Sequence, residues 1–162
     1  MKSAGASPKK PAQGLYERDF YEWLLAQVSA LKERRFRELD LENLIEEVEA
    51  LAGSLRRELR NRLRVVLVHL LKRRYQPEKR SSSWTVTLLE QRQQIEGLLE
   101  QSPSLRRMVP ESVEKVYPSA TKRAGLEMRR TNLQHIFPAP CPWTVDQILD
   151  EDYLPSGTRS RG

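Results

Sequence analysis

The chain has 162 residues, of which 38% are hydrophobic and 31% charged, and its formal net charge is +6. This length and composition are typical of one soluble domain with a real core, and no apolar run approaches the roughly 20 residues that a membrane span needs. The N-terminus lacks the apolar segment of a secretory signal, and the single cysteine, Cys141, excludes an internal disulfide and a metal site built on paired cysteines. We therefore expect a cytoplasmic protein that binds neither a cofactor nor a metal and does not contact a membrane.

Charge is arranged along the chain in blocks. Residues 40–51 contain five acidic side chains and no basic one, whereas residues 54–80 contain ten basic and two acidic side chains. A block of one sign favours either an oppositely charged partner or pairing inside the protein. Both alternatives stay open at this point.

The first part of the chain is a tail followed by a helix. Residues 1–14 are rich in proline, lysine and serine without periodicity, which indicates a flexible basic tail. Apolar residues then recur at three- and four-residue steps and predict a helix over about residues 16–34, on the positions Leu15, Phe20, Trp23, Leu24, Val28 and Leu31.

A long central helical run follows, with Asp40 as its expected N-cap. Its apolar stripe continues from Leu41 to Leu71, and residues 62–71 are apolar on most sides, as in a helix surrounded by other elements. Gly53 followed by Ser54 interrupts this run, and a glycine inside a helix costs about 1 kcal/mol. We predict two helices with a kink or tight corner at Gly53, and a sharp corner would bring the acidic segment beside the basic one.

The remaining pattern is helical up to a proline-rich segment. We expect a helix over about residues 84–101, capped by one of the serines 81–83, then a short turn after Pro103 and a helical region over residues 110–125. Pro118 lies inside that region and predicts a kink or two short helices. Residues 126–135 give a weak signal, residues 137–143 form an extended strap, and Thr144 caps a short helix over residues 145–150. The fold class is therefore all-α: a single compact domain over residues 15–155, with a long central helix, a proline-rich C-terminal strap and a flexible tail over residues 156–162.

Five blocks of the sequence together resemble a bacterial family known as "domain of unknown function 29". They are residues 15–24, 33–54, 62–84, 102–105 and 141–155. The resemblance covers nearly the whole predicted domain and implies an all-α fold. It implies no catalytic or binding residue. The chain departs from the family pattern at Pro118 and in residues 126–135.

His69 is the sharpest candidate for chemistry. A histidine acting as a general base needs a neighbour that sets its tautomer and pKa, and Glu46, Glu47 or Glu49 would supply it if the chain folds back at Gly53. With Glu42, these carboxylates would also suit a metal-assisted hydrolase or nuclease. The alternatives are a histidine at the edge of the core and a solvated acidic helix face.

The basic block is the second candidate site. Arg56, Arg60 and Arg64 are four residues apart and share a helix face, and Arg57 flanks them. With the aromatic residues Tyr75 and Trp84 interleaved, the second group suits a phosphate backbone and stacked bases. This group comprises Lys72, Arg73, Arg74, Lys79 and Arg80. Internal pairing with the acidic helix is the alternative.

Two further features favour structural roles. Cys141 lies between two prolines with His135 as its only sequence-near base, so we expect a small apolar anchor for the strap rather than a nucleophile. The aromatic first helix is expected to pack in the core, with homodimerisation as the alternative. The sequence as a whole favours a non-enzymatic binding or assembly module with a nucleic acid or protein partner over an enzyme.

Overall fold

The computed structural model describes residues 14–129 and 137–157, and every regular element among them is helical. These residues belong to two compact units, Met1–Ser54 and Leu55–Gly162. The predicted all-α class is confirmed over this part of the chain. The predicted tails lie largely outside it, because residues 1–13 and 158–162 are not described. The prediction of a single domain over residues 15–155 stays a prediction.

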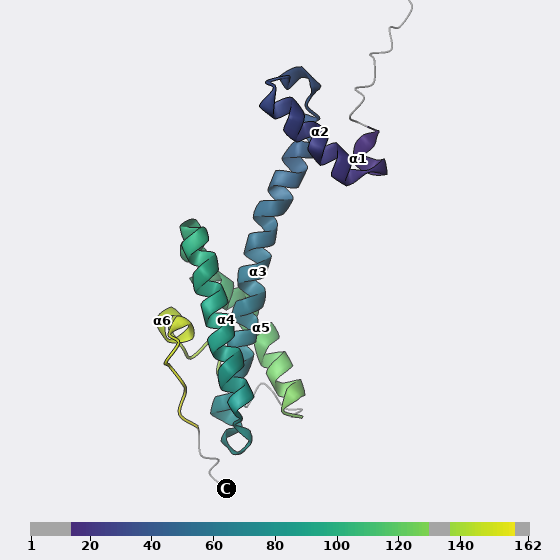
Figure 1. The fold of residues 1–162 in the computed structure, drawn as a ribbon. Coiled ribbons are helices and arrows are strands. Elements are labelled where there is room, and N and C mark those ends of the chain that lie inside the picture. Colours follow the sequence, from purple (N-terminus) through teal and green to yellow (C-terminus); the bar gives the residue numbers. More distant parts are fainter. Residues whose placement is uncertain (1–13, 130–136, 158–162) are drawn as a thin grey trace, which may run out of the picture. The chain divides into compact units, whose positions relative to one another are not determined.

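The first unit begins with two helices where the sequence predicted one. α1 spans Leu15–Arg18 and α2 spans Phe20–Lys32 (Figure 1). Asp19 separates them because its backbone is not helical and its side chain accepts a hydrogen bond from the Glu22 amide, as an N-cap does. The prediction of one helix over residues 16–34 is therefore wrong at its start. After α2 comes a 3₁₀ turn, η1, over Phe36–Glu38.

A buried aspartate, Asp40, forms hydrogen bonds with three other residues of the first unit. Asp40 is only 3% exposed. Its carboxylate accepts from Trp23 Nε1 at 3.2 Å and Asn43 Nδ2 at 2.8 Å, and its backbone N–H donates to Gln27 Oε1 at 2.8 Å. Trp23 is fully buried, and the Tyr16 ring meets it edge-on. The first helix thus uses its aromatic residues partly as a core, as the sequence predicted.

α3 is one continuous helix of 35 residues, Leu41–Tyr75. The prediction of two helices that separate at Gly53 is wrong. A penalty of about 1 kcal/mol for a helical glycine is small against the long helical runs on both sides, and the Ser54 hydroxyl donates to the Leu51 carbonyl without ending the helix. The predicted division of the helix at Gly53 is therefore absent. Both α3 ends agree with the sequence, since Asp40 precedes it and Pro77 follows it.

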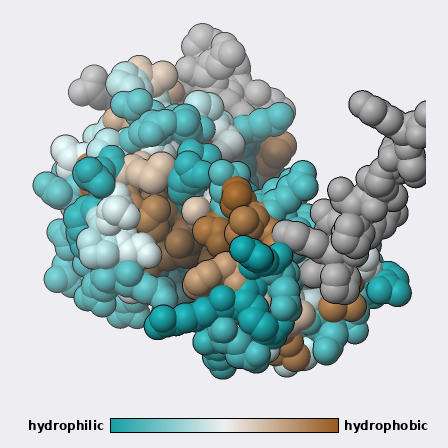
Figure 2. All heavy atoms as spheres, turned by 90° about the horizontal axis from the view of Figure 1, so that it is seen from above, coloured by the Kyte–Doolittle hydropathy of each residue, from teal (hydrophilic) through white to brown (hydrophobic). Residues whose placement is uncertain are grey.

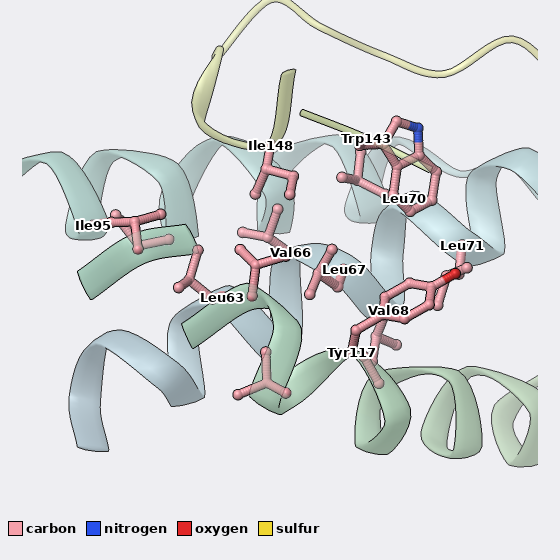
Figure 3. Packing of buried hydrophobic residues seen from close by; sticks show 14 of the residues in the cluster. Leu63, Val66, Leu67, Val68, Leu70, Leu71, Ile95, Tyr117, Trp143 and Ile148 are labelled. Atoms are coloured by element: carbon pink, nitrogen blue, oxygen red, sulfur yellow. The ribbon is translucent and has the colours of Figure 1, made fainter. Parts of the chain in front are cut away.

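The second unit surrounds the C-terminal part of α3 with three more helices. α4 spans Ser82–Gln101, α5 spans Val109–Glu127 and α6 spans Val145–Leu149 (Figure 1). The 3₁₀ turn η2 (Pro77–Lys79) connects α3 to α4, and the 3₁₀ turn η3 (Pro103–Met108) connects α4 to α5. Figure 3 shows side chains from these helices meeting around α3. Six residues of α3 are fully buried there, which confirms its central role: Leu59, Leu63, Val66, Leu67, Leu70 and Leu71.

α5 passes through Pro118 as a single helix, so the predicted division into two short helices is wrong. Pro118 has no backbone N–H to give to the Glu114 carbonyl, but both residues lie on the exposed face, where water can serve that carbonyl. The opposite face buries Val113, Val116 and Ala120 in the core, and this packing outweighs the lost bond.

The predicted strap is anchored at both ends. Phe137 and Trp143 are buried, and the Tyr117 hydroxyl donates to the Pro138 carbonyl at 2.8 Å. Thr144 then forms a capping box with Gln147 at the start of α6, as predicted. No helix of the described chain has the length and apolar character to cross a membrane.

Candidate functional site

His69 is half-buried on α3, one helical turn after Val65. Its Nδ1 lies 2.9 Å from the Val65 carbonyl oxygen, so Nδ1 carries a proton and Nε2 is the free nitrogen of the neutral ring. Burial lowers the pKa of His69, and the positive charges of Lys72 and Arg123 act in the same direction. The hydrogen bond to the Val65 carbonyl and the charge of Glu127 raise the pKa, but together they do not outweigh the other influences. Neutral imidazole is therefore the favoured form.

A small pocket opens at His69 between α3 and α5. Its volume is about 170 Å³, and it is lined by Arg64, Val65, Val68, His69, Arg123 and Glu127. Glu127 Oε2 accepts from Lys72 Nζ at 2.8 Å and Oε1 accepts from Arg123 Nε at 3.0 Å. These bonds keep the pKa of Glu127 below its ordinary value although burial alone would raise it. The sequence analysis did not identify Arg123 and Glu127 of α5. Their spacing of four residues, which allows an ion pair on a helix, was the one feature that could have indicated them.

The carboxylates predicted to assist His69 belong to the first unit. Glu46 and Glu49 are exposed on α3. Glu47 accepts a 2.6 Å hydrogen bond from Tyr16, which raises the pKa of that tyrosine to about 12. Because α3 is continuous through Gly53, the corner that would have carried these groups back to His69 does not exist. Within residues 14–129 and 137–157, no three histidine, cysteine, aspartate or glutamate side chains group in a way that could hold a metal ion.

The first basic group keeps its predicted common face on α3. Arg56 and Arg57 are exposed, and Arg60 and Arg64 are half-buried. Arg64 Nη2 donates to Asn61 at 3.1 Å, and the Nε atoms of Arg60 and Arg64 are buried without a hydrogen-bond partner in the described structure. None of the ion pairs of the described chain joins this group to Glu46, Glu47 or Glu49. Internal pairing with these carboxylates, the alternative from the sequence, stays a prediction.

The second basic group is largely tied into the fold. Lys72 is only 9% exposed, pairs with Glu127 and lies 4.5 Å from the centre of the Trp84 ring. Arg73 donates to Thr85 Oγ1 at 3.0 Å, and burial lowers the pKa of its guanidinium. Arg80 donates to the carbonyls of Arg73 and Pro155. Lys72, Arg73 and Arg80 were predicted from the sequence to contact nucleic acid, but in the structure each forms contacts within the fold.

The two remaining members of that group differ in their surroundings. The Arg74 guanidinium lies 5.7 Å from the Tyr75 ring and 6.0 Å from the Trp143 ring, whereas Lys79 is exposed on η2. Of the second group, Lys79 and Arg80 are the exposed members, and Arg80 is engaged by its bonds to the two carbonyls.

A buried arginine that sequence reasoning did not single out joins α4 to α6. Arg92 is 1% exposed. Its Nε donates to the Ile148 carbonyl at 2.9 Å and its Nη1 to the Tyr153 carbonyl at 2.9 Å, with longer bonds to the carbonyls of Gln147 and Glu151. A guanidinium at the C-terminal end of a helix satisfies carbonyls that have no partner inside that helix.

Comparison with known protein families gives a match over most of the chain. The family model described as "Domain of unknown function DUF29" matches residues 15–154, which include nearly all of the described chain. The chain belongs to the DUF29 family. No curated protein and no solved structure matches it. The resemblance predicted from the sequence is confirmed, and the family description assigns no activity to any residue of this DUF29 chain.

The strap of the DUF29 chain borders a second pocket, of about 440 Å³, against α5. Its walls include Tyr117, Pro140, Cys141 and Trp143. The Cys141 thiol is half-buried and donates to the Trp143 carbonyl at 3.8 Å, and burial raises its pKa. A raised pKa disfavours the nucleophilic thiolate, which accords with the predicted anchoring role. His135, the sequence-near base, lies outside the described residues.

Apolar side chains remain exposed over much of the first unit. Figure 2 shows hydrophobic side chains reaching the surface among hydrophilic ones. On α3, Leu41, Ile45, Val48 and Leu51 are 57%, 58%, 64% and 64% exposed. On α2 and η1 the exposed members are Phe20, Tyr21, Leu25, Val28, Leu31 and Phe36. Exposed apolar side chains that gather into a patch mark an interaction site in many proteins.

Proposed function

We propose that this DUF29 chain is a non-enzymatic assembly module, in which the N-terminal part of α3 pairs with the same part of a second copy. The observation that carries the proposal is the exposed apolar stripe of α3. Its four large members, Leu41, Ile45, Val48 and Leu51, are each more than half exposed although they lie on a well-formed helix. A helix of that kind normally buries its apolar stripe against a neighbour.

The spacing of the stripe favours a second helix of the same kind. Leu41, Ile45, Val48 and Ala52 follow one another at steps of four, three and four residues, which is the alternation of the two core positions in a coiled coil. Two identical helices with this spacing can interdigitate side chains along a common seam. A second copy therefore complements the stripe without any further partner.

The flanking charges favour a parallel arrangement. With Leu41, Ile45, Val48 and Ala52 as core positions, Glu42 and Glu49 occupy one flank, and the other flank carries Leu44 and the remaining stripe residue, Leu51. In a parallel pair, each flank of one helix faces the opposite flank of its partner, so the glutamates face leucines. An antiparallel pair would place Glu42 and Glu49 against the same residues of the other copy, where like charges repel.

The gain from this burial is moderate. Completely burying one such side chain contributes about 1.5–3 kcal/mol. The three large core side chains, Leu41, Ile45 and Val48, are about 60% exposed; their burial then contributes roughly 3–5 kcal/mol per copy, and a pair roughly 5–11 kcal/mol. Association itself costs about 4–15 kcal/mol. We therefore expect a reversible dimer whose population depends on concentration.

Sedimentation analysis over about 1 to 300 µM tests the proposal. The full chain is expected to shift from monomer to dimer over this range, and the double substitution I45Q/V48Q is expected to remove the shift. Both replaced side chains are exposed, so the monomer keeps its fold. The matched control is V86Q/L126Q, which removes two exposed apolar side chains of α4 and α5. A chain that stays monomeric throughout, or a control that weakens association as much as I45Q/V48Q, would refute the proposal.

A second candidate function is contact with a nucleic-acid backbone through Arg56, Arg57 and Arg60. The observation in its favour is that Arg56 and Arg57 are exposed on one face of α3 and that none of the three forms an ion pair with a described residue. Binding of a random single-stranded pool should then weaken steeply with salt, with a slope of roughly −0.7 in log K for each phosphate contacted.

The variant R56Q/R60Q should reduce that slope by about 1.4, while R62Q should leave it unchanged. Arg62 is the matched control because it lies on the same helix and is already paired with Glu58. The absence of salt-sensitive binding by the full chain would eliminate this candidate.

A further inference from the structure

The pocket at His69 has the size of a small anion. Its volume of about 170 Å³ is below the roughly 300–1,000 Å³ of pockets that hold drug-sized organic ligands. It corresponds to about five or six water molecules at roughly 30 Å³ each. A phosphate or sulfate group with one or two waters fits this space.

The charges around the pocket are predominantly positive. Arg64 and Arg123 line it, and Lys72 lies directly behind Glu127. Glu127 is the one carboxylate among the lining residues, and each of its oxygens already accepts a bond, one from Lys72 and one from Arg123. The pocket and its surroundings therefore contain three positively charged side chains and one carboxylate, that of Glu127, whose two oxygens already accept hydrogen bonds. The pocket retains a net charge of about +2 with neutral His69.

Donors remain available on the arginines. Arg123 uses Nε for Glu127, which fixes the direction of its guanidinium, and its side chain is 70% exposed. The hydrogen bond of Arg64 to Asn61 engages Nη2 only. Arginine presents five N–H donors in a planar fork that matches the oxygens of phosphate and sulfate. Two such forks from different helices can thus hold one anion between α3 and α5.

We propose that this pocket binds the oxyanion of a phosphate or sulfate group, held by Arg64 and Arg123 with His69 as a proton-dependent third donor. The site lies wholly within the second unit and involves none of the residues of the assembly proposal. Tetrahedral oxyanions are favoured over carboxylates because they offer oxygens in three or four directions, toward α3, α5 and the imidazole.

His69 couples the site to pH. Nδ1 is committed to Val65, so only a protonated ring can donate from Nε2 to an anion. The charged groups that act on His69 from α3 and α5 are Lys72, Arg123 and Glu127, and Arg64 also lines the pocket. An anion offsets these cations and stabilises imidazolium. Affinity should therefore increase as pH falls and His69 gains its proton, because the bound anion raises the pKa of His69 above that in the free protein.

Sulfate is the first probe, because it remains a dianion throughout this pH range. In the full-length, tag-free H135Q protein His69 is the one remaining histidine, and its NMR titration should move to higher pH as sulfate is added. Calorimetry should show sulfate binding that is at least about tenfold tighter at pH 5.5 than at pH 7.5. R64Q and R123Q should each weaken binding about tenfold or more.

Two variants separate the site from general effects of charge. R62Q removes the same charge from the opposite side of α3 and should bind sulfate as the unsubstituted chain does. H69Q should keep binding at pH 7.5 but lose the pH dependence. The proposal is overturned if sulfate leaves the His69 titration unchanged, if R62Q weakens binding as much as R64Q, or if H69Q keeps the full pH dependence.

A competition experiment identifies the source of the anion. Inorganic phosphate and a short oligothymidylate are added separately to the sulfate-loaded protein while the His69 signal is followed. Displacement by phosphate alone assigns the site to free anions or phosphate monoesters, and displacement by the oligonucleotide as well assigns it to a phosphodiester backbone. Displacement by neither would contradict oxyanion specificity.

Discussion

Replacing Arg92 with methionine removes a buried guanidinium that donates to four backbone carbonyls. Those carbonyls belong to Gln147, Ile148, Glu151 and Tyr153, at the end of α6 and just beyond it. Methionine has a similar length and fills space flexibly. The substitution therefore tests hydrogen bonding more than packing.

The expected cost follows from the bond lengths. Two of the four bonds, to Ile148 and Tyr153, are 2.9 Å long, and the others are 3.2 and 3.3 Å. A hydrogen bond to a charged group contributes about 1.5–3 kcal/mol, so the two short bonds contribute about 3–6 kcal/mol. Desolvation of the guanidinium, which lowers the pKa of Arg92, offsets part of this gain. We expect R92M to lower the free energy of unfolding by about 3 kcal/mol and the melting temperature by about 6–12 °C.

Urea unfolding followed by circular dichroism measures this difference, and hydrogen exchange locates it. The amides of α6 should lose protection before those of the buried part of α3. Arg106 supplies the control, because it is exposed and paired with Glu96, and R106M should cost less than about 0.5 kcal/mol. A loss of under about 1 kcal/mol for R92M, or an effect equal to that of R106M, would show that the carbonyl bonds contribute little.

Two further predictions concern His69 and Pro118. Because the pKa of His69 is lowered in the folded state, the contribution of neutral His69 to stability is complete above about pH 6.5 and is lost as pH falls through the folded-state value. The urea midpoint of the unsubstituted chain should therefore decline between pH 7.5 and 5, and H69Q should flatten this decline. An unchanged decline in H69Q would refute the assignment of this pH dependence to His69. P118A should raise the free energy of unfolding by about 2 kcal/mol, because it restores the N–H that the Glu114 carbonyl lacks while the unfolded chain gains some freedom. A melting temperature that is the same or lower would mean that the proline is already accommodated at no cost.

Periodicity predicted the elements of the second unit well. The helix predicted over about residues 84–101 corresponds to α4, Ser82–Gln101, and the N-cap at Thr144 lies at its predicted place. These features depend on neighbours three or four residues apart, which a single sequence displays directly.

The errors have a different origin. A capping aspartate, Asp19, divided the first helix, while Gly53 and Pro118 did not divide theirs, because local propensities of about 1–3 kcal/mol compete with packing that the sequence does not display. The candidate site shows the same limit. Lys72 and Glu127 are 55 positions apart in the chain, so neither spacing nor charge pattern could pair them or bring Arg123 to His69.

Arg92 also has a consequence for the order in which the chain is made. The residue precedes its partner Ile148 by 56 positions. At about 5–20 residues per second, synthesis takes roughly 3–11 seconds to cover that distance. During this interval α4 exists without the carbonyls that its guanidinium will bond, so the buried side of α4 cannot be completed. α6 is thus the helix that completes the buried side of α4, and a nascent chain released before α6 is made would expose both a charge and an apolar face to chaperones and proteases.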